Sequence, residues 1–200
     1  WNTSYPLDSS DWEGYRVPGS LPFEQDNRVS FYIHIPFCKQ LCSFCEYTRM
    51  ICPDESVQRE YLFAIAHDIK HFREKYPDIT LLGFDIGGGT PTALSEKNFA
   101  LLMQIYQTAI SGLKMDDNYE PSIEGTFNTL SEQKLEAMAK MGIRRLSLGV
   151  QSSCNAVLSQ HQRRNSSEAM MSSWLKKAWN KGIKKVNLDF MYGLKGQNES

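Results

Sequence analysis

Three cysteines lie close together in the run FYIHIPFCKQLCSFCEY, where Cys38, Cys42 and Cys45 have the spacing CxxxCxxC. Cysteine thiolates are the usual ligands of iron–sulfur clusters, and a four-iron cluster ordinarily takes four of them. Three thiolates would leave one iron of a [4Fe-4S] cluster without a protein ligand, and an open iron can bind a substrate. The spacing therefore predicts a metal centre that acts on a bound small molecule.

A structural zinc site is the alternative for these cysteines. His34 and Cys52 are the nearest residues that could complete a zinc knuckle. The CxxxCxxC spacing differs from the paired CxxC of zinc knuckles, and the cysteines directly follow a β-branched and aromatic stretch that predicts a strand. We therefore favour the cluster, and interpret Cys52 as a loop thiol and Cys154 as a small buried apolar residue.

A second candidate site is the segment Gly87 to Thr92, which reads GGGTPT and follows another apolar run. Consecutive glycines allow close backbone approach and positive φ angles, and they expose N–H and C=O groups that a zwitterionic amino acid could bind. A tight turn before a helix would have the same sequence. The position of this turn, after a second predicted strand, favours a binding role.

Further charged or amide side chains stand at the ends of other apolar runs. Glu124 lies in PSIEGTF and could accept hydrogen bonds from ribose hydroxyls, or be an exposed edge charge or part of an ion pair. Gln151 ends the run RLSLGVQ and could bind a polar group of adenosine or of a substrate. Arg163 and Arg164 could pair with a carboxylate or be solvated. Asp189 is again an acid near the end of an apolar strand, VNLDF.

Short apolar runs alternate with stretches of helical period from Val29 onwards. The expected strands are 30–35, 79–86, 122–127, 144–150 and 183–190, and the expected helices are 53–76, 95–111, 131–142 and 166–180. This alternation predicts an α/β fold of parallel β/α units, closed into a barrel or open as a twisted sheet. In both, ligands bind at the carboxyl ends of the strands, where every candidate motif falls. We expect an irregular N-terminal arm over residues 1–28 and one core domain over 29–200.

The composition limits the classes of partner. The chain has 41% hydrophobic residues, and its 22 Lys and Arg against 23 Asp and Glu leave no basic surface typical of nucleic-acid binding. It has no apolar run long enough to cross a membrane, and its first residues lack the features of a signal peptide. The chain has five cysteines, an odd number that cannot all pair within the chain, so a disulfide framework is not expected. We expect a cytoplasmic protein with a small-molecule substrate and neither nucleic-acid nor membrane partners.

Five ordered motifs resemble the oxygen-independent coproporphyrinogen III oxidase family and its haem-chaperone relatives, within the radical S-adenosylmethionine (SAM) superfamily. The motifs are YIHIPFCxxxCxFC, GGGTPT, IE, RLSLGVQS and NLDFMYGL, between about Val29 and Gln197. The resemblance implies a partial (β/α)6 barrel. The chain would stop after the fifth strand of that barrel, so we expect it to be part of a longer protein.

The resemblance also implies the cofactors and the residues that hold them. Cys38, Cys42 and Cys45 would bind a [4Fe-4S] cluster, SAM would chelate the open iron, and an electron from the cluster would cleave SAM to a 5′-deoxyadenosyl radical. A reducing electron donor such as flavodoxin would supply that electron. The residues of this sequence that fall on positions lining the SAM pocket of the family are Tyr32, Phe44, Gly88, Gly89, Thr90, Glu124, Gln151, Arg163 and Asp189.

One departure from the family bears on the reaction. Members that oxidise coproporphyrinogen carry a fourth Cys two residues after the third, and Tyr47 stands at that position here. A radical SAM enzyme acting on a tetrapyrrole-like or other organic substrate is our first expectation. A haem-binding chaperone with the same cluster and SAM site, and a radical SAM methyltransferase, are the alternatives.

Overall fold

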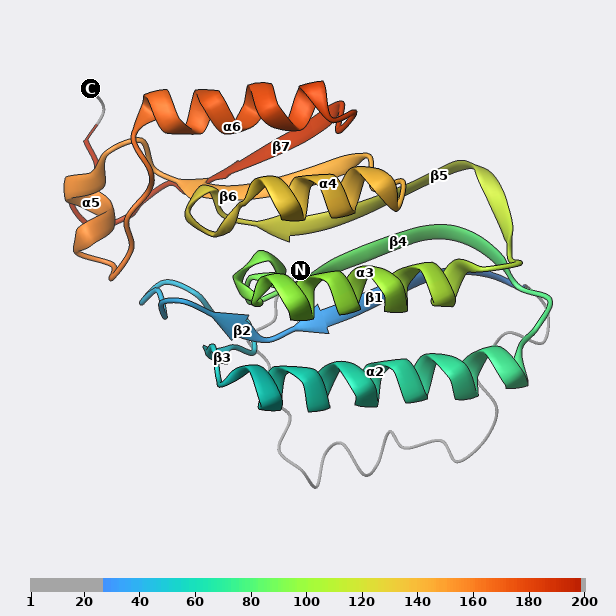
Figure 1. Ribbon diagram of the computed structural model, residues 1–200. Coiled ribbons are helices and arrows are strands. Elements are labelled where there is room, and N and C mark those ends of the chain that lie inside the picture. The colour runs from blue at the N-terminus through green and yellow to red at the C-terminus, as the bar shows by residue number, and fades with distance from the viewer. Residues whose placement is uncertain (1–26, 199–200) are drawn as a thin grey trace.

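The computed structural model describes residues 27–198, which form a sheet covered by helices (Figure 1). The five-stranded sheet contains β1 (Arg28–Ile35), β4 (Thr80–Gly88), β5 (Lys114–Gly125), β6 (Arg145–Gln151) and β7 (Lys185–Phe190). The longer helices are α2 (Glu55–Lys75), α3 (Glu96–Ile110), α4 (Glu132–Lys140) and α6 (Glu168–Asn180). The shorter elements are β2 (Phe37–Cys38), β3 (Met50–Ile51), η1 (Pro91–Ala93), η2 (Phe127–Thr129) and α5 (Asn155–Ser159).

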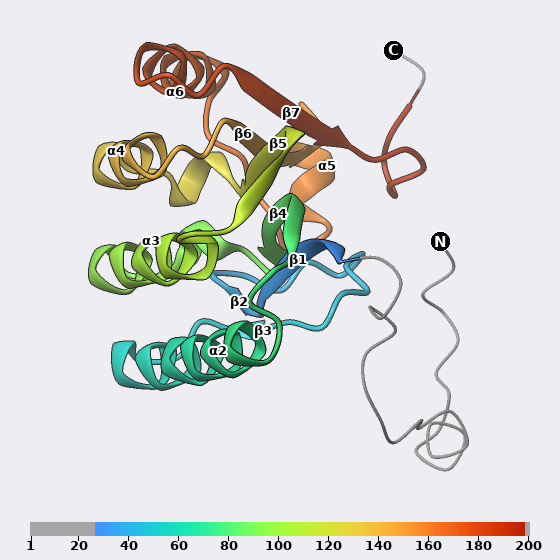
Figure 2. The same cartoon turned by 90° about the vertical axis from the view of Figure 1, so that its right-hand side faces the viewer.

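The strands stand in the sheet in chain order, β1-β4-β5-β6-β7, and each neighbouring pair is parallel. The helices α2, α3, α4 and α6 lie side by side on one face of the sheet (Figure 2). A doubly wound sheet carries helices on both faces and reverses its strand order at a switch point. Sequential strands with helices on one face are instead the wall of a β/α barrel. The predicted parallel partial-barrel fold is confirmed.

The core lies between the sheet and the helices. Successive strand side chains point to opposite faces, so every second residue of a strand meets the helices. On β4 these residues are Phe84 and Ile86, both fully buried. Phe84 packs edge-on against Phe31 of β1 and Tyr106 of α3, with ring centroids 5.6 and 4.8 Å away. Buried residues of the helices such as Leu62 complete the core.

The helix boundaries follow local capping chemistry. Ser95 and Ser131 accept hydrogen bonds from the backbone N–H groups of Asn98 and Lys134, which satisfies donors at the starts of α3 and α4. Gly142 follows α4 with a φ of 79°, a left-handed conformation that favours glycine and ends the helix. These caps fix where each chain segment turns back toward the sheet.

The third strand of the sheet differs from the sequence-based expectation. A strand over 122–127 was expected, whereas β5 begins at Lys114 and ends at Gly125, and Phe127 lies in η2. The extension pairs Lys114 and Met115 with Thr80 and Leu81 of β4, before a register shift. Its sequence, KMDDNYE, is mostly polar and contains no fully buried residue, although Met115 and Tyr119 pack against the core, so an apolar pattern could not reveal it.

The predicted arm over residues 1–28 lies mostly outside the described residues, and its two described residues include Arg28, the first residue of β1. No helix in the described part of the chain combines the length and apolarity needed to span a bilayer.

Candidate cofactor site

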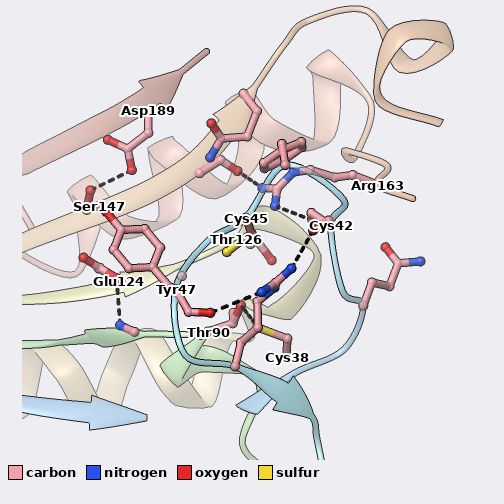
Figure 3. Close-up of a pocket in the computed structure, with 18 of the residues that line it drawn as sticks. Cys38, Cys42, Cys45, Tyr47, Thr90, Glu124, Thr126, Ser147, Arg163 and Asp189 are labelled. Carbon is pink, nitrogen blue, oxygen red and sulfur yellow. Dashed lines mark hydrogen bonds between the residues drawn. The ribbon is translucent and has the colours of Figure 1, made fainter. Parts of the chain in front are cut away.

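A cavity of about 820 Å³ opens at the carboxyl ends of the strands, and every residue predicted to bind a cofactor lines it. The predicted residues are Tyr32, Cys38, Cys42, Phe44, Cys45, Gly88, Gly89, Thr90, Glu124, Gln151, Arg163 and Asp189. They come from all five strands of the sheet or the turns that follow them, and Figure 3 shows several of them around the same space. The structure therefore brings together residues that are far apart in sequence.

The cysteine loop leaves β1 and is closed at its base by a short parallel pairing of β2 with β3. The backbone N–H of Met50 donates to Pro36 at 2.8 Å, and that of Cys52 donates to Cys38 at 2.8 Å. Arg49 ties the middle of the loop, because its guanidinium donates to the carbonyl oxygens of Cys42 and Tyr47. This closure directs Cys38, Cys42 and Cys45 into the cavity (Figure 3).

The three cysteines are free thiols in surroundings that suit an iron–sulfur cluster. Cys38 and Cys42 are buried, and Cys45 is half-buried. The Thr90 hydroxyl and the Arg163 guanidinium donate to the sulfur atoms of Cys38 and Cys42, each at 3.6 Å. Burial raises the pKa of the Cys38 thiol; the Thr90 hydrogen bond opposes this, and the charges of Cys45 and Cys42 add to it. Bound iron would counter this effect by stabilising the thiolates.

The residues considered for a zinc knuckle are occupied by other contacts. Nε2 of His34 donates to the carbonyl oxygen of Thr48 at 2.8 Å, and the Cys52 sulfur accepts from Gln58 at 3.3 Å. Within residues 27–198, no group of three or more His, Cys, Asp or Glu side chains is arranged to hold a single metal ion. Three free thiols on one cavity fit a cluster, whose irons are bound one to each thiolate.

The glycine turn makes room for two side chains of neighbouring strands. A Cβ atom on Gly87 would lie 2.7 Å from the carboxyl group of Glu124, and one on Gly88 would lie 2.6 Å from the His34 ring. Gly88 also has a φ of 112°, which only glycine adopts without strain. Its N–H donates to the Glu124 carboxylate at 3.1 Å. The turn thus holds the Glu124 carboxylate at the cavity wall.

Glu124 is exposed at the cavity, and the neighbouring protein partly desolvates its carboxylate. Burial raises its pKa above the usual value of 4.5, the Gly88 hydrogen bond lowers it, and the nearby charges of Asp189 and Asp85 raise it. Burial, with the Glu124 charge next, also raises the pKa of Tyr32 to about 12, so its hydroxyl stays protonated. That hydroxyl donates to Nδ1 of His34 at 3.4 Å. Both groups can therefore orient a polar ligand.

Gln151 and Arg163 meet at the end of β6. Gln151 has a φ of 68°, an unusual backbone conformation for a residue other than glycine. The Arg163 guanidinium donates to the carbonyl oxygen of Gly149. A Cβ atom added to Gly149 would lie 3.1 Å from this guanidinium and 2.9 Å from the Gln151 side-chain amide. Such a strained residue often marks a binding site, because the surrounding structure must hold it in place.

Asp189 of β7 lies across the cavity from the cysteine loop (Figure 3). Its carboxylate accepts hydrogen bonds from Ser147 at 3.2 Å and from Asn187 at 2.5 Å. Ser147 of β6 and Asn187 of β7 are partners in the sheet, so the register of these strands orients the Asp189 carboxylate. Asp189 could accept hydrogen bonds from a bound hydroxyl with its remaining lone pairs.

The cavity contains further residues that sequence reasoning did not select. They are Gln40, Glu46, Arg49, Gly125, Thr126, Ser147, Gly149 and Met191, together with Tyr47, which had been noted only as a departure. Ser147 could have been found, because it lies four residues before the predicted Gln151 on the same face of a predicted strand. Arg49 lies in an irregular loop whose pattern gives no signal.

Phe44 has further contacts besides the cavity, and the prediction for Cys154 is wrong. Phe44 lies over the ring of His161, with centroids 5.8 Å apart, and packs on the small apolar cluster that includes Val157 and Leu158. Cys154 is exposed rather than buried as predicted. It precedes α5, which is so short that it buries only Val157 and Leu158.

The comparisons with known proteins agree with this geometry. The sequence pattern of the radical SAM superfamily matches residues 32–200. The haem chaperone HemW of Bacillus subtilis (strain 168) is 33% identical over 168 residues, which cover 84% of this chain and 43% of HemW. The oxygen-independent coproporphyrinogen III oxidase of Escherichia coli (strain K12) is 29% identical over 198 residues, which cover 98% of this chain and 42% of the oxidase.

Solved structures lead to the same fold. The structure of the E. coli coproporphyrinogen III oxidase HemN, described as a radical SAM enzyme, has a TM-score of 0.74 at 29% identity and covers 85% of this chain and 38% of that one. A structure of anSMEcpe with bound AdoMet has a TM-score of 0.55 at 14% identity, covers 80% of this chain and 43% of that one, and shows a similar fold alone. The chain spans less than half the length of these relatives. Proteins of the radical SAM superfamily bind a [4Fe-4S] cluster and SAM, and this chain belongs to that superfamily.

Proposed function

We propose that this chain is the cluster-binding and SAM-binding part of a radical SAM enzyme that acts on a tetrapyrrole-like or other organic substrate. The observation that carries the proposal is the single cavity that joins three free thiols with the polar ends of all five strands. Cys38, Cys42 and Cys45 would hold the [4Fe-4S] cluster. When bound, the cluster supplies the electron that cleaves SAM to a 5′-deoxyadenosyl radical.

The protein side chains would bind and orient SAM around the cluster. Gly88, Gly89 and Thr90, next to Cys38, would hold the amino group of SAM through backbone C=O groups. Their N–H groups already donate to Glu124, Ile35 and Phe37. Glu124 would accept hydrogen bonds from the ribose hydroxyls, and Arg163 would pair with the carboxylate.

The remaining predicted residues would complete the SAM pocket. Tyr32 would lie beside the methionine part, and Phe44 would approach the adenine. Gln151 and Asp189 would bind polar groups at the far wall of the cavity. We assign these roles within residues 29–200 as the core domain, with an electron donor such as flavodoxin as an external partner.

Electron paramagnetic resonance at low temperature tests this proposal. The anaerobically reconstituted and dithionite-reduced protein is expected to show a four-iron signal that shifts when SAM is added. A C45S variant should lose the intact cluster, whereas the matched control C52S should keep it, because Cys52 contacts Gln58 and the backbone of Ala93 instead. A colourless protein with stoichiometric zinc would refute the proposal.

A haem chaperone is the second candidate, and Tyr47 favours it. Tyr47 stands where the oxidases have a fourth Cys, and the structure places it on the cavity with 66% of its surface exposed. A relative named as a haem chaperone also has a higher identity to this chain than the oxidases do. Haem retention with little SAM consumption would identify a chaperone, whereas SAM consumption coupled to modification of an added tetrapyrrole would identify an enzyme.

A further inference from the structure

A buried lysine binds two turns that carry residues of the cofactor cavity, and it has no place in the proposed SAM contacts. Lys134 belongs to the first turn of α4, and its side chain is 8% exposed. Its ammonium group donates to the carbonyl oxygen of Thr92 at 2.8 Å and to that of Thr129 at 3.3 Å. Glu96 lies 3.6 Å away at the solvent edge, and the Phe99 ring lies 5.9 Å away on the other side.

The two carbonyl groups belong to turns that follow neighbouring strands. Thr92 lies in η1, directly after the glycine turn at the end of β4, and Thr129 lies in η2, directly after β5. One ammonium group therefore joins the two turns. Their threonine hydroxyls are also linked, because Thr92 and Thr129 are 2.6 Å apart and Thr126 and Thr129 are 3.0 Å apart.

The close approach of the two turns has a specific requirement in the sequence. A Cβ atom on Gly125 would lie 2.5 Å from the Thr92 hydroxyl, so only glycine at the end of β5 lets the turns meet. Thr92 itself is fully buried. The turns thus form one interlocked unit, and Lys134 reaches this unit from α4.

Stability alone is a poor reason to bury this charge. Burial lowers the pKa of Lys134, while the charge of Glu96 raises it, which shows that the protein environment disfavours the ammonium. A whole buried ion pair can often be replaced by apolar residues of similar volume without loss of stability, although removal of one partner alone is costly. The ammonium does supply two directed hydrogen bonds that an apolar side chain could not. The distinctive contribution of the Lys134 ammonium is therefore to hold two carbonyl groups in fixed positions.

The interlocked turns carry residues of the cavity. Thr90 stands two residues before Thr92, lines the cavity and donates to the Cys38 sulfur. Thr126 opens η2 and lines the cavity from the other turn. We propose that Lys134 is a positioning residue that fixes these two turns against each other and so places Thr90 and Thr126 for SAM binding. This inference rests on the proposed function.

Two substitutions on the same helix test the inference. K134M keeps the volume and removes the hydrogen bonds, and K140M is the matched control because Lys140 is exposed near the end of α4. K134M is expected to fold with an unchanged cluster content, to bind SAM about 10-fold more weakly, and to show a smaller SAM-induced shift of the EPR signal. K134R, which restores charged donors, should recover part of the affinity, and K140M should behave as the wild type.

A second variant keeps the test informative if K134M folds poorly. T129V removes the hydroxyl link between the turns and leaves Lys134 in place, and it should weaken SAM binding in the same direction but less. Wild-type SAM affinity in K134M, or in T129V where K134M does not fold, would overturn the inference. A loss of affinity that only parallels a loss of thermal stability would also overturn it. If the wild-type protein holds no cluster that responds to SAM, the proposed function is wrong and this inference is wrong with it. If the wild-type cluster responds to SAM and K134M binds SAM with the same affinity, only this inference is wrong.

Discussion

Replacement of Gly87 by alanine is expected to separate SAM binding from stability. A Cβ atom at this position would lie 2.7 Å from the Glu124 carboxyl carbon, about 0.8 Å closer than an ordinary contact of about 3.5 Å. The Glu124 side chain can swing away, because it ends in the open cavity, so the fold has little to lose. The carboxylate would then leave the position fixed by the Gly88 N–H, where it is proposed to meet the ribose of SAM.

The size of the effect follows from the hydrogen bond that is lost. A hydrogen bond to a charged group contributes about 1.5 to 3 kcal/mol, which corresponds to a SAM dissociation constant about 10- to 150-fold higher. Gly83 lies on the same strand, and a Cβ atom there would meet only the Ser30 side chain, whose nearest atom, Oγ, is 3.4 Å away. G83A is therefore the matched control, and both variants should keep their free energy of unfolding within about 1 kcal/mol of the wild type.

Calorimetric titration of the reconstituted variants with SAM measures the effect, and denaturant unfolding measures stability. A double-mutant cycle sharpens the test, because G87A should cost nothing further in an E124A background, where no carboxyl group remains to be displaced. Equal SAM affinities of G87A and G83A would refute this account of the glycine turn. An additive effect of G87A and E124A would refute the contact with Glu124 as its cause.

Two more predictions concern the protein without SAM. Burial holds the pKa of Glu124 above 4.5, so the native state keeps a proton that the unfolded state has already lost. The free energy of unfolding should therefore fall as pH rises through the range just above 4.5, and the E124Q variant should lack this pH dependence. Urea unfolding measures both proteins, and parallel pH profiles would contradict the raised pKa of Glu124. Phe84 is fully buried between Phe31 and Tyr106, so F84A should lower the free energy of unfolding by about 3 to 5 kcal/mol, and a loss below about 1 kcal/mol would show that the packing is not as described.

The sequence was sufficient for those parts of the site that depend on chain order. Cys38, Gly88, Glu124, Gln151 and Asp189 each stand at or just beyond the end of an apolar run, and parallel strands bring all such ends to one edge. Their convergence required no knowledge of side-chain contacts. Tyr32 and Phe44, in contrast, carry no such signal and were selected only by the family resemblance.

The contacts made by irregular segments could not be predicted in the same way. Lys134 lies in EQKLEAMAK, where a lysine in the first helical turn reads as a solvated residue, and only the approach of η1 and η2 turns its ammonium inward. The pairing of β2 with β3 involves two residues on each side, too few for any period. Such features follow from loop closure and from three-dimensional packing, which local patterns do not encode.

The register of the sheet explains why polar residues occur inside apolar strands at all. Tyr32, Asp85, Ser122 and Arg145 are successive partners across β1, β4, β5 and β6, and the Arg145 guanidinium reaches over β5 to Asp85 at 2.9 Å. Two residues further along β5 and β6, Glu124 pairs with Ser147. Residues at this two-residue spacing face away from the buried residues that meet the helices. A sheet covered by helices on both faces would read as continuous apolar runs, so the alternation in PSIEG and RLSLG itself indicates a second face that serves a polar cavity.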